Sequence, residues 1–251
     1  MYGDANARMA TAGELVPALD EAKIDRAVAA GFAFARASDL AAQNEYLQAA
    51  AAESGGRIIA LATVNLALPG WEHAAATSID QRMRGFGELR PHSQGWDPLG
   101  AASHTLCDLA AASGSVLLWH VSEPVGHAYP GKRGGITPAE LCELATVHPS
   151  TVMIAAHLGG GLPFYLQMPE VRAALSRTYF DTAAWSLLYD DVSITRVIDL
   201  AGSDRVLFGS DYPLLSPRRQ IQRITALLPG DTARAVCGGN ADTLFSDRHD
   251  S

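Results

Sequence analysis

Three side chains that can bind metal ions or transfer protons come just after short apolar runs in the sequence. The run at 116–119 is followed by His120, the run at 152–156 by His157, and the run at 206–208 by Gly-Ser and then Asp211. Short apolar runs without alternation are typical of strands buried on both faces of a parallel sheet. Because such strands end on the same side, we expect these side chains to converge at their carboxyl ends.

The chemistry that fits these residue types is assisted by a metal ion. Neutral imidazole and carboxylate are suitable ligands for a borderline cation such as zinc. Water bound to such a cation has a pKa near ~7, and a nearby carboxylate such as Asp211 can then accept its proton. One histidine alone would more often be a hydrogen-bonded core residue, but three strand ends of this kind favour a site.

Strands and helices alternate along the chain, as they do in parallel α/β folds. Seven apolar strands are predicted near residues 30, 60, 86, 118, 154, 180 and 207. Helix starts are predicted at the capping boxes Thr11–Glu14 and Thr137–Glu140, at Asp97, and at Ser216 followed by Pro217. We therefore predict an α/β fold, a (β/α)8 TIM barrel in one domain over residues 1–251. A closed barrel of this type has eight strands, so one strand is expected to be missing at the front.

Composition argues against several classes of function. The formal net charge of −8 and the lack of basic runs disfavour a nucleic-acid or anionic-membrane surface. No apolar stretch has membrane-spanning length, and the start of the chain lacks a secretory signal pattern. Three cysteines that form no close pair fit a reducing compartment. We expect a cytoplasmic protein with a small-molecule substrate and no nucleic-acid or membrane partner. The same features are compatible with a homodimer.

The combined motifs resemble the amidohydrolase-related family. They are His120 at a strand end, the turn His157–Gly161, the run Gly209–Pro213 and the segment Gly238–Ala241. This branch of the amidohydrolase superfamily includes metal-dependent hydrolases and aminocarboxymuconate-semialdehyde-type decarboxylases. The resemblance implies a TIM barrel with one divalent metal ion, usually zinc. It also implies that His120 and Asp211 are metal ligands, that Asp211 takes a proton from the attacking water, and that His157 orients or protonates the reacting group.

The family's remaining ligands form a His-x-His pair on the first barrel strand, and this sequence contains no such pair. The missing strand and the missing ligands are thus the same gap. We expect it to lie between the strands at 24–34 and 206–208 and to leave two strand edges unpaired. We also expect Met1 to be an internal methionine, preceded in a longer protein by that strand.

Residues near strand ends and on the loop after His120 are candidates for substrate binding. They are Glu88, Arg90, His127, Tyr129, Lys132, Asp181 and Trp185. Lys132, with Arg133, could bind a substrate carboxylate, although a solvated loop is equally consistent. Glu88 could instead be a buried carboxylate paired with Arg90 or Arg36, and Trp185 and Tyr212 could be packing residues.

The leading functional prediction is a metal-dependent hydrolase in which activated water attacks a C–N or C–O bond of a small polar substrate. One alternative is a non-oxidative decarboxylase that uses the same metal site. Another is a catalytically degenerate barrel that binds a ligand or partner without turnover. The metal content of the purified protein separates the enzymes from the last alternative.

Overall fold

Seven parallel strands form the centre of the computed structural model, which describes residues 9–246. They are β1 (Ala27–Ala30), β2 (Ile58–Leu61), β3 (Gly85–Leu89), β4 (Val116–Trp119), β5 (Val152–Ala155), β6 (Thr178–Asp181) and β7 (Val206–Leu207). β1 pairs with β2, and β3 to β7 pair in sequence order. Ala62, just after β2, joins the two sheets, because its N–H donates to Gly85 and its carbonyl accepts from Gly87, each over 2.8 Å. All seven predicted strands are confirmed.

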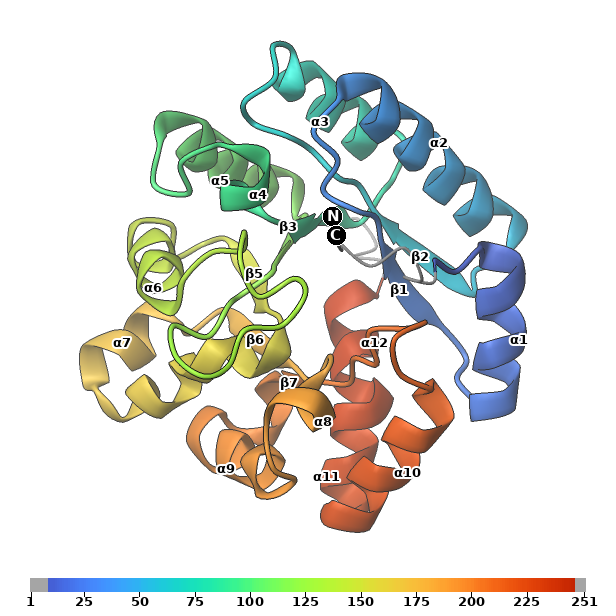
Figure 1. Cartoon of the computed structure of the whole chain (residues 1–251), viewed down its shortest axis with the longest axis vertical. Helices are drawn as coiled ribbons and strands as arrows, with labels where there is room; N and C mark the ends of the chain where they lie inside the picture. The colour runs from blue at the N-terminus through green and yellow to red at the C-terminus, as the bar shows by residue number, and fades with distance from the viewer. Residues whose placement is uncertain (1–8, 247–251) are drawn as a thin grey trace.

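Helices surround the strands and alternate with them along the chain, as predicted (Figure 1). The longer ones are α1 (Ala12–Ala22), α2 (Ala37–Glu53), α3 (Trp71–Asp80), α5 (Ala101–Ser113), α6 (Pro138–Val147), α9 (Val192–Ala201) and α10 (Pro217–Leu227). The shorter ones are α4 (Pro91–Gln94), α7 (Pro169–Ala174), α8 (Trp185–Leu188), α11 (Gly230–Arg234), α12 (Asn240–Phe245), the 3₁₀ segments η1 (His157–Gln167) and η2 (Ser203–Arg205), and the π-helical η3 (Ala235–Gly239). The arrangement is that of a TIM barrel, which confirms the predicted fold class.

The expected gap lies between β1 and β7. Within residues 9–246 no ladder joins these two strands. The edge of β7 nevertheless finds partners in the C-terminal helices: the Phe208 N–H donates to the Val236 carbonyl over 2.9 Å, and Asn240 Nδ2 donates to the Val206 carbonyl over 2.7 Å. The prediction that this strand edge would be unpaired is therefore wrong, because η3 and α12 satisfy its backbone groups.

Strand side chains alternate between two apolar clusters. One cluster contains Val152 and Ile154 of β5 together with residues of other strands, and the other contains Met153 and Ala155 together with residues of the outer helices. The first cluster is therefore the interior of the barrel, and the second is the layer between strands and helices. Phe245 of α12 packs with the interior cluster, which ties the C-terminal helix to the strands.

Local capping chemistry explains most helix starts. Thr11 and Thr137 form the predicted capping boxes with Glu14 and Glu140, and Ser216 caps α10. The predicted start at Asp97 is wrong, because α5 begins at Ala101 with Gly100 as N-cap. Asp97 Oδ1 instead accepts from the Leu99 N–H over 2.9 Å, so its side chain closes a turn before the helix.

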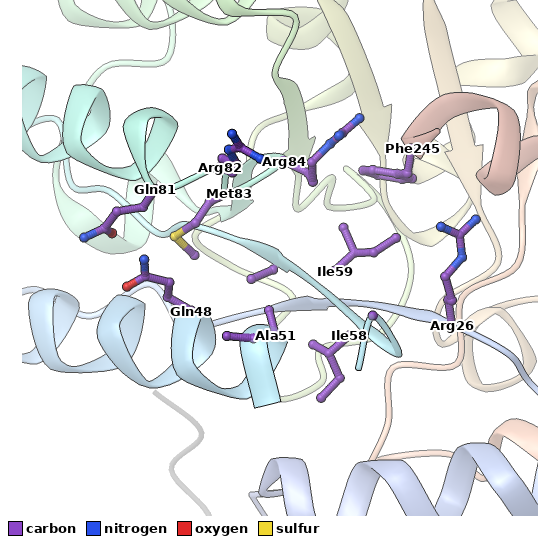
Figure 2. A pocket seen from close by; sticks show the side chains of 13 residues that line it. Arg26, Gln48, Ala51, Ile58, Ile59, Gln81, Arg82, Met83, Arg84 and Phe245 are labelled. Carbon is purple, nitrogen blue, oxygen red and sulfur yellow. The ribbon is translucent and has the colours of Figure 1, made fainter. Parts of the chain in front are cut away.

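A cavity of about 350 Å³ opens beside the amino ends of β1, β2 and β3. Arg26, Arg82, Arg84 and Phe245 are among its lining residues, and Figure 2 shows them around Ile59 of β2. Because Arg26 and Arg84 precede their strands, the cavity lies at the end opposite the predicted site. Among the described helices, none combines the length and the apolar character needed to cross a membrane.

Candidate active site

Glu88, His120 and His157 come together at the carboxyl ends of β3, β4 and β5. Glu88 Oε1 lies 3.0 Å from His120 Nδ1 and 3.3 Å from His157 Nε2. The same two ring nitrogens lie 3.1 Å apart. Each histidine side chain is only 6% exposed and that of Glu88 is 24% exposed, so the three groups form a compact cluster with two buried members and one half-buried member. The structure thus brings His120 and His157 together as expected, with Glu88 as the third member.

Backbone carbonyls fix which nitrogen of each ring carries a hydrogen. His120 Nε2 lies 3.0 Å from the Gly131 carbonyl, and His157 Nδ1 lies 3.0 Å from the Ala183 carbonyl. A carbonyl oxygen can only accept, so both of these nitrogens donate. In the neutral rings, the lone pairs of His120 Nδ1 and His157 Nε2 therefore face each other and Glu88. Three electron-pair donors at this spacing need a proton or a cation between them.

The charges of the cluster follow from this arrangement. Burial disfavours the charged form of His157, but the hydrogen bond and negative charge of Glu88 raise its pKa to about 10. Burial also lowers the pKa of His120, against the opposing influence of Glu88. The pKa of Glu88 is held well below its usual range, because the two histidines outweigh its desolvation. These pKa shifts favour the shared proton on His157, beside an ionised Glu88.

A strained turn after β5 holds His157 in place. His157 has a φ of 59° and Gly159 a φ of 63°, both in the left-handed region, where a residue other than glycine is uncommon. Asp181 Oδ1 accepts the His157 N–H over 3.0 Å and the Ala183 N–H over 2.9 Å. Burial raises the pKa of Asp181 to about 6, against the charge of His157 and these two donors. Asp181 thus ties both ends of the contact that orients the His157 ring.

Asp211 lies beside the cluster but is not one of its three ligand groups. Its residue keeps exposed surface, and within residues 9–246 its carboxylate makes no hydrogen bond or ion pair. Its negative charge helps to raise the pKa of His157. Desolvation and the charge of Glu88 raise the pKa of Asp211 itself, which favours proton transfer by this group. Metal ligation and proton transfer by Asp211 remain predictions.

Arg90 is buried behind Glu88 and binds the loop after β4. Its Nη1 lies 4.0 Å from Glu88 Oε2, at the limit of an ion pair. Its Nη2 donates to the Gly131 carbonyl over 2.6 Å and to the Arg133 carbonyl over 2.9 Å. The Arg90 Nε has no partner among the described residues. Arg36, the other candidate partner of Glu88, pairs instead with Asp39 over 2.8 Å.

The remaining substrate candidates lie in different surroundings. Lys132 donates to the Val125 carbonyl and, over 2.8 Å, to the His127 carbonyl, while its ammonium lies 5.5 Å from the Tyr129 ring centroid. Trp185 has no exposed surface and belongs to the strand–helix core. The position of Trp185 fits packing, and the position of Lys132 fits a bracing role in its own loop. Substrate binding by these residues, and by the exposed His127, remains a prediction.

Sequence reasoning missed several groups that shape the site. The carbonyls of Gly131 and Ala183, which set the two tautomers, carry no side-chain signal at all. Glu123 also went unnoticed, although it follows His120 closely and accepts hydrogen bonds from Tyr129 and Tyr189. Its place on the loop after a strand end was the available signal.

A family comparison agrees with this geometry. The model of the family described as Amidohydrolase matches residues 2–246, which is nearly the whole chain. The chain belongs to this amidohydrolase family. Among curated proteins, 6-methylsalicylic acid decarboxylase from Penicillium expansum is 33% identical over 119 residues. The match covers 39% of this chain. The match spans only 36% of that decarboxylase, about a third of its length.

Solved structures show the same fold. The 5-carboxyvanillate decarboxylase of Novosphingobium aromaticivorans, complexed with manganese and 4-hydroxy-3-methoxy-5-nitrobenzoic acid, is similar with a TM-score of 0.77 and 17% identity, covering 97% of this chain and 85% of its own. The 2,6-dihydroxybenzoate decarboxylase from Rhizobium is similar with a TM-score of 0.74 and 16% identity, covering 92% and 87%. At these identities the likeness supports the fold alone.

The donor set of this amidohydrolase fits a divalent cation. Glu88 supplies a carboxylate oxygen and the two histidines supply imidazole nitrogens, and all three ligand atoms lie within 4.8 Å of one another. Carbonyls on the far side of each ring orient the lone pairs inward, which is the usual support of metal-binding histidines. Such a mixed oxygen and nitrogen set suits manganese as well as zinc.

Proposed function

We propose that this chain is a metal-dependent, non-oxidative decarboxylase of hydroxybenzoic acids. The names of the similar proteins carry this proposal, since they are decarboxylases of 6-methylsalicylic acid, 5-carboxyvanillate and 2,6-dihydroxybenzoate. Each of these compounds has a hydroxyl beside the carboxylate that its enzyme removes. These matches favour our decarboxylase alternative over the leading hydrolase prediction. The cluster of Glu88, His120 and His157 supports a metal-dependent reaction.

The reaction needs a proton and a place for an electron pair. A proton adds to the ring carbon that bears the carboxylate, and the bond between that carbon and the carboxylate then breaks. Carbon dioxide leaves, and the electron pair of the broken bond restores the aromatic ring. When bound, the cation supplies Lewis acidity toward the substrate oxygens.

The chain's own residues would supply the proton and the orientation. Glu88, His120 and His157 would hold the cation. Asp211 is the best candidate for the proton donor, because its raised pKa favours a protonated carboxyl beside the cluster. Asp181 keeps the His157 turn in place through its two backbone hydrogen bonds.

The test is conversion of 2,6-dihydroxybenzoate and 6-methylsalicylate by purified protein loaded with manganese or zinc. We expect release of carbon dioxide, and one deuterium on the product ring when the reaction runs in deuterium oxide. 4-Hydroxybenzoate, which lacks a hydroxyl next to its carboxylate, is the matched control and should not react. Asp211→Asn should abolish turnover more completely than it weakens metal binding, because an amide cannot deliver the proton.

The other readings give different results. Cleavage of amide or ester substrates, with every hydroxybenzoate left intact, would support the hydrolase. Protein that takes up neither manganese nor zinc and converts nothing would support the degenerate, ligand-binding barrel. Metal analysis of the active protein also decides between manganese and zinc.

A further inference from the structure

We propose that Glu123 is a positioning residue, which fixes His120 for metal binding by bonding Tyr129 within the loop at 122–136 and by anchoring this loop to Tyr189. The inference deepens the proposed metal site and rests on it. Glu123 touches neither the cluster of three ligand groups nor, in this assignment, the substrate. It would act through the backbone of the loop, which carries the carbonyl that orients the His120 ring.

The base of this loop is packed tightly against His120. The Ile136 N–H donates to the His120 carbonyl over 2.9 Å, and the Ser122 N–H donates to the Ile136 carbonyl over 3.1 Å. A Cβ atom on Gly135 would lie 2.1 Å from the His120 carbonyl oxygen, so only glycine permits this approach. The Gly131 carbonyl then accepts from His120 Nε2 over 3.0 Å. The position of the loop therefore decides whether the His120 ring has its acceptor.

The far part of the loop is held by a carboxylate with two phenol donors. Tyr129, within the loop, donates to Glu123 Oε2 over 2.5 Å. Tyr189, which ends α8 in the segment after β6, donates to Glu123 Oε1 over 2.9 Å. The second bond joins the segment after β4 to the segment after β6. Glu123 thus links the segments that follow β4 and β6, two strands that are separated in the sheet by β5.

Burial and the charge of Glu123 favour the hydrogen bonds that Tyr129 and Tyr189 donate to its carboxylate. Among the described residues Glu123 makes no ion pair, and the two phenols donate hydrogen bonds to its carboxylate. Burial, together with the nearby carboxylate of Glu123, raises the pKa of Tyr129 and of Tyr189. Both phenols therefore stay protonated and keep donating at neutral pH. Hydrogen bonds to a charged acceptor are stronger than neutral ones.

Loss of one phenol that donates to Glu123 should therefore change the hydrogen bonding of the His120 ring. A displaced loop removes the Gly131 acceptor, and the His120 hydrogen can then move from Nε2 to Nδ1. The Nδ1 lone pair that faces Glu88 and His157 would be lost in that tautomer. Mutation of residues that orient metal-binding histidines typically lowers metal affinity by about 10- to 100-fold.

The test uses Tyr189→Phe, which removes one hydroxyl and keeps the ring, with Tyr165→Phe as the matched control. Tyr165 is exposed, and no hydrogen bond of its hydroxyl exists among the described residues. In metal-free protein, the ¹⁵N NMR shifts of the His120 ring report its tautomer. We expect the Nε2–H form in the natural chain and in the control, and a mixture of tautomers in Tyr189→Phe. The dissociation constant for manganese should rise about tenfold in Tyr189→Phe.

The proposal fails if Tyr189→Phe keeps both the tautomer and the manganese affinity, or lowers only the melting temperature. Glu123→Gln, which retains an acceptor oxygen but no charge, repeats the measurement if Tyr189→Phe does not fold. Neither readout depends on decarboxylation. An altered tautomer in a protein that converts no hydroxybenzoate would therefore support the positioning role and reject the proposed reaction.

Discussion

Glu88 Oε1 lies 3.0 Å from Nδ1 of His120, although the His120 ring already donates through Nε2 to a backbone carbonyl. The neutral ring therefore directs a lone pair toward a carboxylate, an arrangement that is stable only with a proton or cation between the two. The neighbouring His157 supplies that proton in the metal-free protein. This contact makes Glu88 central to the cluster, where sequence reasoning had treated it as a substrate contact or a buried ion-pair partner.

Glu88→Gln should weaken divalent metal binding by at least about tenfold, because the neutral amide oxygen is a poorer ligand than a carboxylate. Equilibrium dialysis with manganese or zinc measures the effect. Glu143→Gln, an exposed change on α6, is the matched control and should leave the affinity unchanged. An affinity in Glu88→Gln equal to that of the natural chain would remove Glu88 from the ligand set.

Asp181→Ala should destabilise the fold by about 2–4 kcal/mol, because it leaves one buried and one partly buried N–H donor without an acceptor. These donors belong to His157 and Ala183. Asp181→Asn keeps an acceptor oxygen and should cost clearly less. Urea unfolding of the two variants measures the difference. Equal losses would show that charge, rather than the hydrogen bonds, is what Asp181 contributes.

The stability of the metal-free protein should depend on the titration of His157. Its pKa is raised from 6.5 in the unfolded chain to about 10 in the folded one. The stabilisation from the charged ring is therefore fully present below pH ~6.5 and is lost as the pH rises toward about 10. The difference in unfolding free energy between the natural chain and His157→Gln should shrink over this interval. A constant difference from pH 6 to 10 would contradict the raised pKa.

Phe245→Ala should destabilise the protein by about 3–5 kcal/mol, as expected for truncation of a buried aromatic residue. The Phe245 ring is 5% exposed and packs from α12 against the interior residues of the barrel. Phe164→Ala removes the same side chain at a position that is 65% exposed and should cost little. Thermal or urea unfolding compares the two variants. Similar losses would mean that α12 contributes little to closing the barrel.

Much of the architecture could be predicted from local patterns. Short apolar runs located all seven strands, both those that are buried at every position, such as β5, and β1, which is only partly buried. The capping boxes at Thr11 and Thr137 located two helix starts, since their hydrogen bonds span only three residues. The helix start predicted at Asp97 was wrong, because an aspartate side chain can either cap a helix or close a turn.

Strand ends also indicated which residues could meet. The order of strands and helices was enough to place His120 and His157 at the carboxyl end of a parallel sheet, because their alternation permits few other topologies. The same reasoning placed Glu88 near a strand end as a candidate for substrate binding, but not its contact with the two rings, which the pairing of neighbouring strands creates.

The chemical state of the site depends on contacts between residues that are far apart along the chain. The tautomers of His120 and His157 depend on the carbonyls of Gly131 and Ala183, which lie 11 and 26 residues away along the chain. The partners of the β7 edge come from η3 and α12, where an unpaired edge was expected. Backbone carbonyls and N–H groups are present at nearly every residue, so the sequence gives no sign of which one a fold will place against a given ring.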